Sequence, residues 1–313
     1  MTWTQRNQNL YDAVKTSAAW QERPDLGMIA IRGVDRFTWL QGMVSNDIRE
    51  LERGTPALQA YILNPKGYVL AEVTIISLPA PDPFLVLLLD NGSLFSVLEL
   101  FDRYLIMEDV ELEDLSGSFA CIFVHGKEYT PQHEAGSWFP INVTGSGGWG
   151  FVAAREIIGI WCKELDRRGI PKLSEDVAEV LRIEAGTPVY PHELNSQVIA
   201  MEANNAASHI SFTKGCYVGQ EIIARIDSRG HTNRTLAGFT FPTNALILPN
   251  SRLLNPETGK EVGLLTSVVP FAPAFGAGMA LGYLRHELCE PGTVVQDETG
   301  QPLTVVAFPR SPK

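Results

Sequence analysis

The octapeptide Lys214-Gly215-Cys216-Tyr217-Val218-Gly219-Gln220-Glu221 is the densest group of functional side chains in this 313-residue chain. Its two glycines permit backbone conformations that other residues avoid, and the helix-forming residues 222–225 follow. If Cys216 lies at the N-terminus of that helix with Lys214 nearby, the thiolate is favoured and the sulfur can react or contact a metal or cluster. The alternative is a buried, inert cysteine in a tight turn, because free cysteines are among the most buried residues.

A helix predicted upstream of the octapeptide carries a carboxylate on its apolar side. We expect this helix to begin at Ser174 and to end at Gly186. Glu184 lies seven residues after the apolar Val177, so it projects from the buried face. A desolvated carboxylate has a raised proton affinity and can bind a polar, proton-donating heterocycle. The alternative is that Glu184 only forms a buried ion pair with Arg182 or another base, since structural ion pairs perturb carboxylates too.

The loop after this helix offers a second group of candidates. Tyr190 and Glu193 could flank a planar ring there. We assign no catalytic role to His192, because a lone histidine in a loop is more often a solvated side chain. Asp90, which precedes an Asn-Gly pair, is interpreted as a turn or capping residue.

The first two thirds of the chain mix strands and helices without strict alternation, which predicts an α+β fold. Residues 60–63 and 68–76 have strand character and are separated by a Pro- and Gly-containing turn, so they predict a hairpin. The apolar run 84–89 predicts a buried strand that is followed by a helix over 94–105. Further predicted elements are a helix capped by Asp35 over 35–44, strands at 110–115 and 119–124, and a helix with an apolar face at Ile157, Ile160, Trp161 and Leu165.

After residue 230 the pattern changes to short β-type runs separated by turns. This change predicts a small all-β barrel or sandwich as a separate unit. We therefore predict two domains, an α+β region over 1–229 that consists of two packed subdomains and a β-barrel over 230–313. The predicted strands of the barrel are 235–241, 262–269, 279–283, 293–296 and 303–308.

The composition is that of an ordinary globular protein and narrows the function classes. A net charge of -11 argues against strong nonspecific binding of nucleic acid. The longest apolar run is too short to span a membrane and residues 1–10 lack a signal-peptide core, so we expect a soluble cytoplasmic protein. The four scattered cysteines and the spacing of the histidines predict reduced thiols and no built-in metal site.

The octapeptide resembles the signature of the YgfZ branch of the glycine cleavage T-protein, or aminomethyltransferase, superfamily. Residues 182–186, with Pro188, Tyr190 and Glu193, resemble the Arg-x-Glu-x-Gly block of the superfamily. Matches at 37–47, 63–67, 229–234 and 262–267 extend the resemblance over essentially the whole chain. The resemblance implies a ring-like, three-unit α+β fold with a central folate-sized channel and a small C-terminal β-barrel.

By this resemblance, Glu184 would hydrogen-bond the pterin of tetrahydrofolate or of another reduced folate derivative. Tyr190 and Glu193 would lie near the same pocket, and Asn46 and Asp47 would line it. Cys216, with Lys214, would be the functional group specific to the branch. The remaining motif residues are Gly215, Tyr217, Gly219, Gln220 and Glu221.

The function that the resemblance implies is that of a tetrahydrofolate-binding accessory protein for the assembly, maintenance or repair of iron–sulfur proteins. Its partners would be iron–sulfur client or assembly proteins and a reduced folate, with no nucleic acid and no membrane. The alternative is an aminomethyltransferase that transfers a one-carbon unit to tetrahydrofolate, which requires a carboxylate such as Asp90. Because Asp90 is not matched to the catalytic aspartate of the transferases, we do not expect a classical enzyme.

Overall fold

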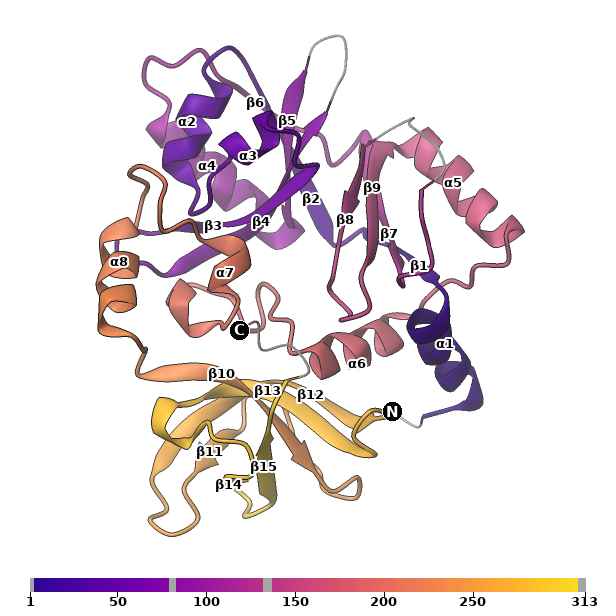
Figure 1. Ribbon diagram of the computed structural model, residues 1–313, viewed down its shortest axis with the longest axis vertical. Coiled ribbons are helices and arrows are strands. Elements are labelled where there is room, and N and C mark those ends of the chain that lie inside the picture. The colour runs from indigo at the N-terminus through magenta and orange to yellow at the C-terminus, as the bar shows by residue number, and fades with distance from the viewer. Residues whose placement is uncertain (1–2, 79–82, 132–136, 309–313) are drawn as a thin grey trace.

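The structure of the protein is a computed structural model, and it describes residues 3–78, 83–131 and 137–308. Two open sheets and a closed barrel surround a central helix, α6 (Glu175–Ala185) (Figure 1). The predicted α+β class, the arrangement of three units and the C-terminal barrel are confirmed.

The first unit is a five-stranded antiparallel sheet in the order β3-β4-β5-β2-β6. The predicted hairpin is confirmed, because β3 and β4 pair and the Gly67 N–H donates to Asn64 O at 2.9 Å across the turn. Asp35 precedes α2 but its side chain does not cap that helix; its carboxylate accepts from the Asp109 N–H instead. The elements of this unit are β2 (Leu26–Arg32), α2 (Arg36–Met43), α3 (Arg49–Glu52), β3 (Ala57–Leu63), β4 (Val69–Leu78), β5 (Phe84–Asp90), η1 (Asn91–Ser93), α4 (Leu94–Tyr104) and β6 (Glu111–Asp114).

The two faces of this sheet have different roles. Ala71, Val73 and Ile75 of β4 alternate toward one face, where they join the core formed with the helices. The intervening residues, which include Glu72 and Thr74, point to the opposite face. That face packs its apolar part against the second sheet, so its polar part lies where the two sheets meet.

The second unit is a four-stranded sheet in the order β1-β7-β9-β8, covered by α5. Trp161 and Leu165 of α5 are buried as predicted, but Ile157 and Ile160 are exposed and Ile158 takes their place. The predicted face was wrong because residues 158, 161 and 165 align along a 3.6-residue period. The elements are β1 (Ala19–Glu22), β7 (Phe119–His125), β8 (Ser137–Pro140), β9 (Gly148–Ala154) and α5 (Arg155–Arg167).

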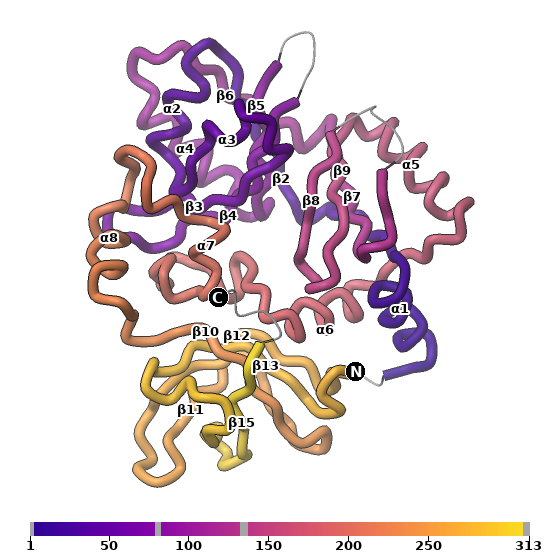
Figure 2. Tube along the Cα trace, viewed as in Figure 1, coloured from indigo at the N-terminus to yellow at the C-terminus, as the bar shows by residue number. Residues whose placement is uncertain are grey.

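An N-terminal helix, α1 (Gln5–Thr16), was not predicted because most of its residues are polar. It has a narrow buried stripe that includes Tyr11 and Val14, and Thr4 forms a capping box at its start. The helix lies beside α6, from which it is far apart in the sequence (Figure 2).

The central helix α6 begins after Ser174 and ends at Gly186, as predicted. Gly186 has a left-handed φ of 67°, and a Cβ there would lie 2.3 Å from the Phe308 ring, so only glycine fits. Ser174 makes no side-chain cap hydrogen bond. The chain then runs through η2 (Ala200–Glu202), α7 (Ala206–His209) and α8 (Gln220–Arg229) to the barrel.

The barrel closes in the order β10-β13-β12-β11-β14-β15, with β15 pairing back to β10. The sequence missed β11, a strand of three residues that is too short to give a pattern. The domain boundary near residue 230 stays a prediction. The elements are β10 (Arg234–Phe241), β11 (Arg252–Leu254), β12 (Glu261–Ala272), β13 (Ala277–Arg285), η3 (His286–Leu288), β14 (Val294–Asp297) and β15 (Pro302–Val306).

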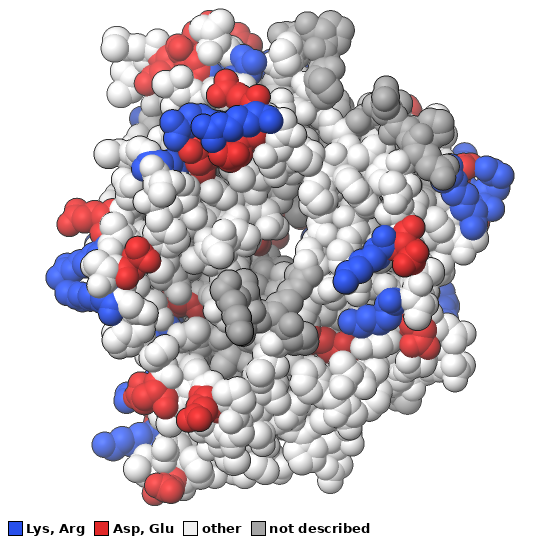
Figure 3. All heavy atoms as spheres, in the orientation of Figure 1, with Lys and Arg blue, Asp and Glu red and all other residues white. Residues whose placement is uncertain are grey.

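The visible surface carries charges of both signs next to one another, without a broad basic patch on this face (Figure 3). Several charged side chains of the described residues form ion pairs, for example Arg49 with Asp47 and Arg167 with Glu164. Among the helices of the described residues, none combines the length and apolar character that crossing a membrane requires.

Candidate functional site

A cavity of about 460 Å³ opens where the two sheets meet the segment that follows α6. Its walls are Glu72, Thr74 and Asp90 from the first sheet, Phe123 from the second sheet, residues 185–190, and a segment that ends at His209. The cavity therefore combines apolar surface with a few carboxylates, an imidazole and the Tyr190 ring. This combination is typical of small-molecule sites.

Glu184 lies just before the wall segment, and its carboxylate is used inside the protein. Oε2 accepts from the Tyr11 hydroxyl at 2.7 Å, and Oε1 accepts from the Ala274 N–H at 2.9 Å. Burial raises the pKa of Glu184, while these two hydrogen bonds and the Lys15 ammonium 4.0 Å away oppose that shift. Glu184 is not among the residues that line the cavity. Its direct contact with a ligand stays a prediction.

Glu193 is fully buried and forms an ion pair with Arg182 at 2.8 Å. Its other oxygen accepts from the hydroxyls of Thr266 and Ser267, at 2.7 and 2.6 Å. Arg182 also pairs with Glu179 and does not pair with Glu184; Glu184 pairs instead with another base, Lys15, at 4.0 Å. Glu193 thus fixes the loop that carries Tyr190 to the barrel.

Neither Asn46 nor Asp47 lines the cavity, but Asn46 supports its wall. The Asn46 side-chain amide donates to Gln59 O at 2.8 Å and to Ser208 O at 3.0 Å, and both of these residues line the cavity. Asp47 pairs with Arg49 at 2.6 Å, and this contact lowers the pKa of Asp47 well below the ordinary range. The structure therefore places Tyr190 at the cavity surface and the four other predicted binding residues behind or beside it.

Lys214 of the octapeptide points into the protein. Its Nζ donates to the carbonyl oxygens of Gln41, Val44 and Asn46 at 2.6, 2.7 and 2.8 Å. Burial lowers the pKa of Lys214 to about 8. Lys214 thus holds the end of α2 and the loop that carries Asn46, and its ammonium is committed to those carbonyls.

Cys216 is exposed, so the alternative of a buried cysteine was wrong. It does not lie at the helix N-terminus, because the cap of α8 is Gly219, which has a φ of 86°. Gly219 closely approaches the hairpin turn, since a Cβ there would lie 2.7 Å from Asn64 O. The Val218 N–H donates to Gly42 O at 3.2 Å. The motif therefore docks on α2 and the hairpin turn and presents Cys216 to solvent; Tyr217 is buried, Gln220 begins α8 and Glu221 is exposed.

Sequence reasoning missed the cavity pair Glu72 and His209. His209 Nε2 lies 2.9 Å from Glu72 Oε1, and the imidazole stacks on Tyr61 with ring centroids 4.7 Å apart. A glutamate in the middle of a mostly apolar strand was the available signal, since such a residue needs a polar environment. His209 gave no signal. Asp90 occupies the N-cap position of the turn η1, which agrees with its interpretation as a turn or capping residue, but its side chain makes no cap hydrogen bond and the residue lines the same cavity.

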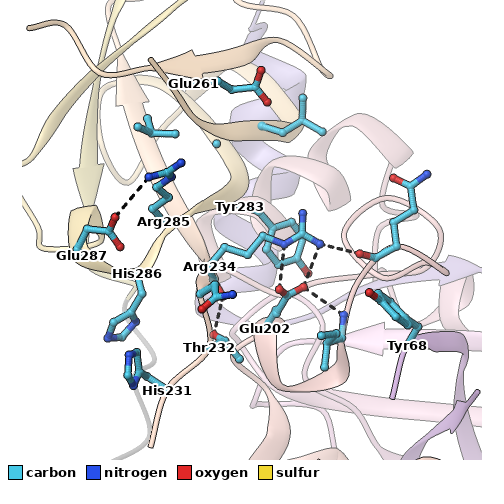
Figure 4. A pocket seen from close by; sticks show the side chains of 16 residues that line it. Tyr68, Glu202, His231, Thr232, Arg234, Glu261, Tyr283, Arg285, His286 and Glu287 are labelled. Carbon is cyan, nitrogen blue, oxygen red and sulfur yellow. Dashed lines mark hydrogen bonds and ion pairs between the residues drawn. The ribbon is translucent and has the colours of Figure 1, made fainter. Parts of the chain in front are cut away.

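A second cavity, of about 910 Å³, lies between the barrel and the segment 197–202 (Figure 4). Arg234 crosses it and pairs with Glu202 at 3.0 Å and with Gln197 O at 2.6 Å. The His231 and His286 rings lie 5.1 Å apart at its edge. None of the predicted site residues lines this cavity.

Within residues 3–78, 83–131 and 137–308, no cluster of three or more histidine, cysteine or acidic side chains is arranged to hold a metal ion.

Comparison with known proteins found relatives of three named kinds, an iron–sulfur cluster assembly factor, aminomethyltransferases and a YgfZ protein, but no matching family model. The chain is 27% identical over 247 residues to an IBA57 homologue of Mycosarcoma maydis, described as a mitochondrial iron–sulfur cluster assembly factor. That match covers 73% of this chain and 59% of the relative, so it spans less than two thirds of the relative's length. A protein of Hamiltonella defensa, named tRNA-modifying protein YgfZ, is 27% identical over 235 residues, covering 69% of this chain and 68% of that protein.

Among solved structures, the chain is similar to the glycine cleavage aminomethyltransferase T of Bartonella henselae. The TM-score is 0.79 at 17% identity, and the match covers 97% of this chain and 89% of the other. At this identity the likeness establishes the fold, and it agrees with the three units described above.

Proposed function

We propose that this chain, a YgfZ-type member of the aminomethyltransferase superfamily, is a tetrahydrofolate-binding accessory protein for the assembly, maintenance or repair of iron–sulfur proteins. The observation that carries the proposal is the exposed Cys216 motif, docked on an α2 loop that also supports the wall of the 460 Å³ cavity. The protein would work in the cytoplasm with iron–sulfur client or assembly proteins as partners.

The cavity supports the ligand part of the proposal. Its volume of about 460 Å³ lies within the range of roughly 300–1,000 Å³ that is usual for small-molecule sites. Apolar walls suit a planar ring system, and the wall carboxylates suit the N–H groups of a pterin. Tyr190 would contact the ring directly, while Glu184, Glu193, Asn46 and Asp47 would hold the surrounding walls. The proposed ligand is tetrahydrofolate or a one-carbon derivative of it.

Cys216 supports the client part of the proposal. An exposed thiol can meet a cluster, a metal ion or a partner thiol without any rearrangement of the core. Lys214, buried below it in the motif, would keep the presenting loop in place. We therefore assign Cys216 the chemical role and Lys214 a structural one.

An aminomethyltransferase is the second candidate. Asp90 and Glu72 favour it, because both carboxylates line the cavity and could organise a one-carbon transfer. This candidate predicts turnover of an aminomethyl donor, which an assay for formaldehyde release or trapping detects. The accessory role predicts no such turnover.

Calorimetric titration of tetrahydrofolate tests the ligand proposal. We expect the wild type to bind and Tyr190→Ala to bind at least about tenfold more weakly, as for a buried aromatic contact. Tyr68→Ala is the matched control, because Tyr68 lines the other cavity. A wild type that binds no reduced folate would contradict the ligand proposal.

Iron–sulfur enzyme activity in cells lacking the protein tests the client proposal. We expect Cys216→Ala to fail to restore this activity while its purified form binds tetrahydrofolate like the wild type. Full restoration by Cys216→Ala would show that the thiol is silent.

A further inference from the structure

Two imidazoles lie close together at the edge of the 910 Å³ cavity, where the end of α8 meets the barrel (Figure 4). His231 follows Gly230, the residue that ends α8, and His286 begins η3 directly after β13. The His286 N–H donates to Asn233 O at 3.0 Å, which ties the two segments together. Both imidazoles are exposed, and neither belongs to the 460 Å³ cavity.

The spacing of the two rings is that of two histidines on one tetrahedral metal ion. A zinc–nitrogen bond of about 2 Å places the ion about 3.2 Å from the centre of each imidazole ring. Two rings at the tetrahedral angle around one ion then have centroids about 5.2 Å apart. The His231 and His286 centroids are 5.1 Å apart, with an interplanar angle of 42°. The centroids therefore lie at the separation that such an ion requires.

Hydrogen bonds around His286 determine which of its nitrogens has a free lone pair. Thr232 Oγ1 donates its only proton to Arg234 O at 2.6 Å, so it can only accept from Thr235 Oγ1, 3.3 Å away. The Thr235 hydroxyl has then donated its own proton and can only accept from His286 Nδ1–H, 3.5 Å away. Nδ1 thus carries the proton and Nε2 offers its lone pair. Metal-binding histidines are typically oriented through their other ring nitrogen in this way.

His231 is the second available ligand. Among the residues that the structure describes, its ring contacts the ring of His286 and has no hydrogen-bond or ion-pair partner. Neutral imidazole is the commonest metal ligand among protein side chains. Zn²⁺ binds well to nitrogen ligands of this kind, whereas Mg²⁺ and Ca²⁺ prefer oxygen ligands. The ligand class that fits the pair is therefore a divalent transition metal ion.

The charges of the neighbouring cavity wall do not oppose a cation. Arg234 is paired with Glu202 at 3.0 Å, and Arg285 lies 3.9 Å from Glu287. With Glu261, three carboxylates face two guanidinium groups among the described residues of the wall. Glu287 points toward Arg285 in Figure 4, so we do not count it as a ligand.

We propose that His231 and His286 form an exchangeable binding site for one Zn²⁺ ion, with His286 coordinating through Nε2 and water completing the coordination. Structural zinc sites have four protein ligands, so a site with two is weaker and keeps open positions. The described part of the chain has no larger metal-binding cluster, which agrees with such a site. A bound ion would connect the end of α8 to the barrel. The inference does not depend on the folate ligand.

Calorimetric titration of ZnCl₂ into the full chain, first freed of metal with EDTA and then dialysed, tests this proposal. A Cys216→Ser background keeps the exposed thiol from binding the ion. We expect one ion per chain with a Kd on the order of 1–100 µM, because two ligands supply about half the binding free energy of four. His231→Ala and His286→Ala should each weaken binding at least about tenfold, and Thr235→Val about tenfold.

His192→Ala is the matched control, because His192 is an exposed histidine outside the pair. It should bind Zn²⁺ like the Cys216→Ser parent. Unchanged binding in both variants of the pair, or no binding by the parent at millimolar Zn²⁺, would overturn the proposal. An equal loss in His192→Ala would mean an adventitious ion only and would overturn it as well. Thermal unfolding in EDTA should give one midpoint for all variants, which shows that an affinity loss is not a loss of folding.

Discussion

The carboxylates on the two sides of the 460 Å³ cavity differ in their orientation and in their hydrogen-bond partners. On the α6 side, Glu184 and Glu193 are turned into the protein, where backbone and side-chain donors satisfy them. On the sheet side, Glu72 lines the cavity, and within the part of the chain that the structure describes only its Oε1 has a partner, His209. The difference teaches that a buried carboxylate on an apolar helix face can serve to fix a wall, while a partly exposed one on a strand can serve recognition.

The largest expected effect comes from breaking the inward-turned network. We expect Arg182→Met to lower the free energy of unfolding by about 3–5 kcal/mol, because it leaves the fully buried Glu193 carboxylate without its cation. Urea denaturation measures this loss. Arg252→Met is the matched control, since Arg252 forms an exposed pair with Glu298, and we expect it to leave the midpoint unchanged. If the urea midpoints of both variants equalled that of the wild type, the Arg182–Glu193 pair would not stabilise the fold, and the contrast between the two sides of the cavity would be wrong.

A smaller loss is expected from Lys214→Met. This change removes three hydrogen bonds and leaves carbonyl oxygens of the 41–46 segment without their donor. We expect a loss of about 2–3 kcal/mol in the free energy of unfolding, measured by the same denaturation. An unchanged midpoint would mean that water replaces the ammonium at no cost.

The dependence of stability on pH tests whether Glu184 is as buried as the structure shows. Burial raises its pKa in the folded state, so its contribution to stability is present below the ordinary glutamate value of about 4.3 and is lost as pH rises through the folded-state pKa. We therefore expect the wild type to lose stability relative to Glu184→Gln as pH is raised above that value. Thermal unfolding of both proteins across this range measures the difference.

Asp47 is the control, because its effect on the pH dependence of stability has the opposite sign. The Arg49 contact lowers the pKa of Asp47, so its contribution is present above the ordinary aspartate value of about 3.9 and is lost as pH falls below it. The wild type should lose stability relative to Asp47→Asn on acidification. The same slope for both pairs of proteins would contradict the different environments assigned to the two carboxylates.

The smallest effect on stability is expected from Cys216→Ser. Cys216 is exposed and makes no core contact, so we expect the unfolding midpoint to stay that of the wild type. Urea denaturation beside Lys214→Met makes the contrast within one motif. A large loss from Cys216→Ser would mean that the thiol supports the fold.

The sequence predicted those parts of the fold that have local patterns. The hairpin around residues 64–67, the helix that ends at Gly186 and the barrel strands followed from turn residues and apolar periodicity. It could not predict α1, whose polar composition hides a narrow buried stripe, or β11, which has three residues. Both elements depend on tertiary contacts that a single sequence does not display.

The candidate site was predictable in its residue types but not in their orientation. Glu184 was expected on a buried face and lies there, yet its partner Tyr11 belongs to the unpredicted helix α1. Lys214 was expected beside Cys216 and instead reaches three carbonyls about 170 residues earlier in the chain. Glu72 and His209 meet only through the fold, since they lie 137 positions apart in the sequence.

The structure of a complex with tetrahydrofolate, determined by crystallography, tests the central claim most directly. The account predicts that the ligand occupies the 460 Å³ cavity, with its heterocycle between Tyr190 and Glu72. A ligand bound in the 910 Å³ cavity beside Arg234, or elsewhere on the surface, would contradict it.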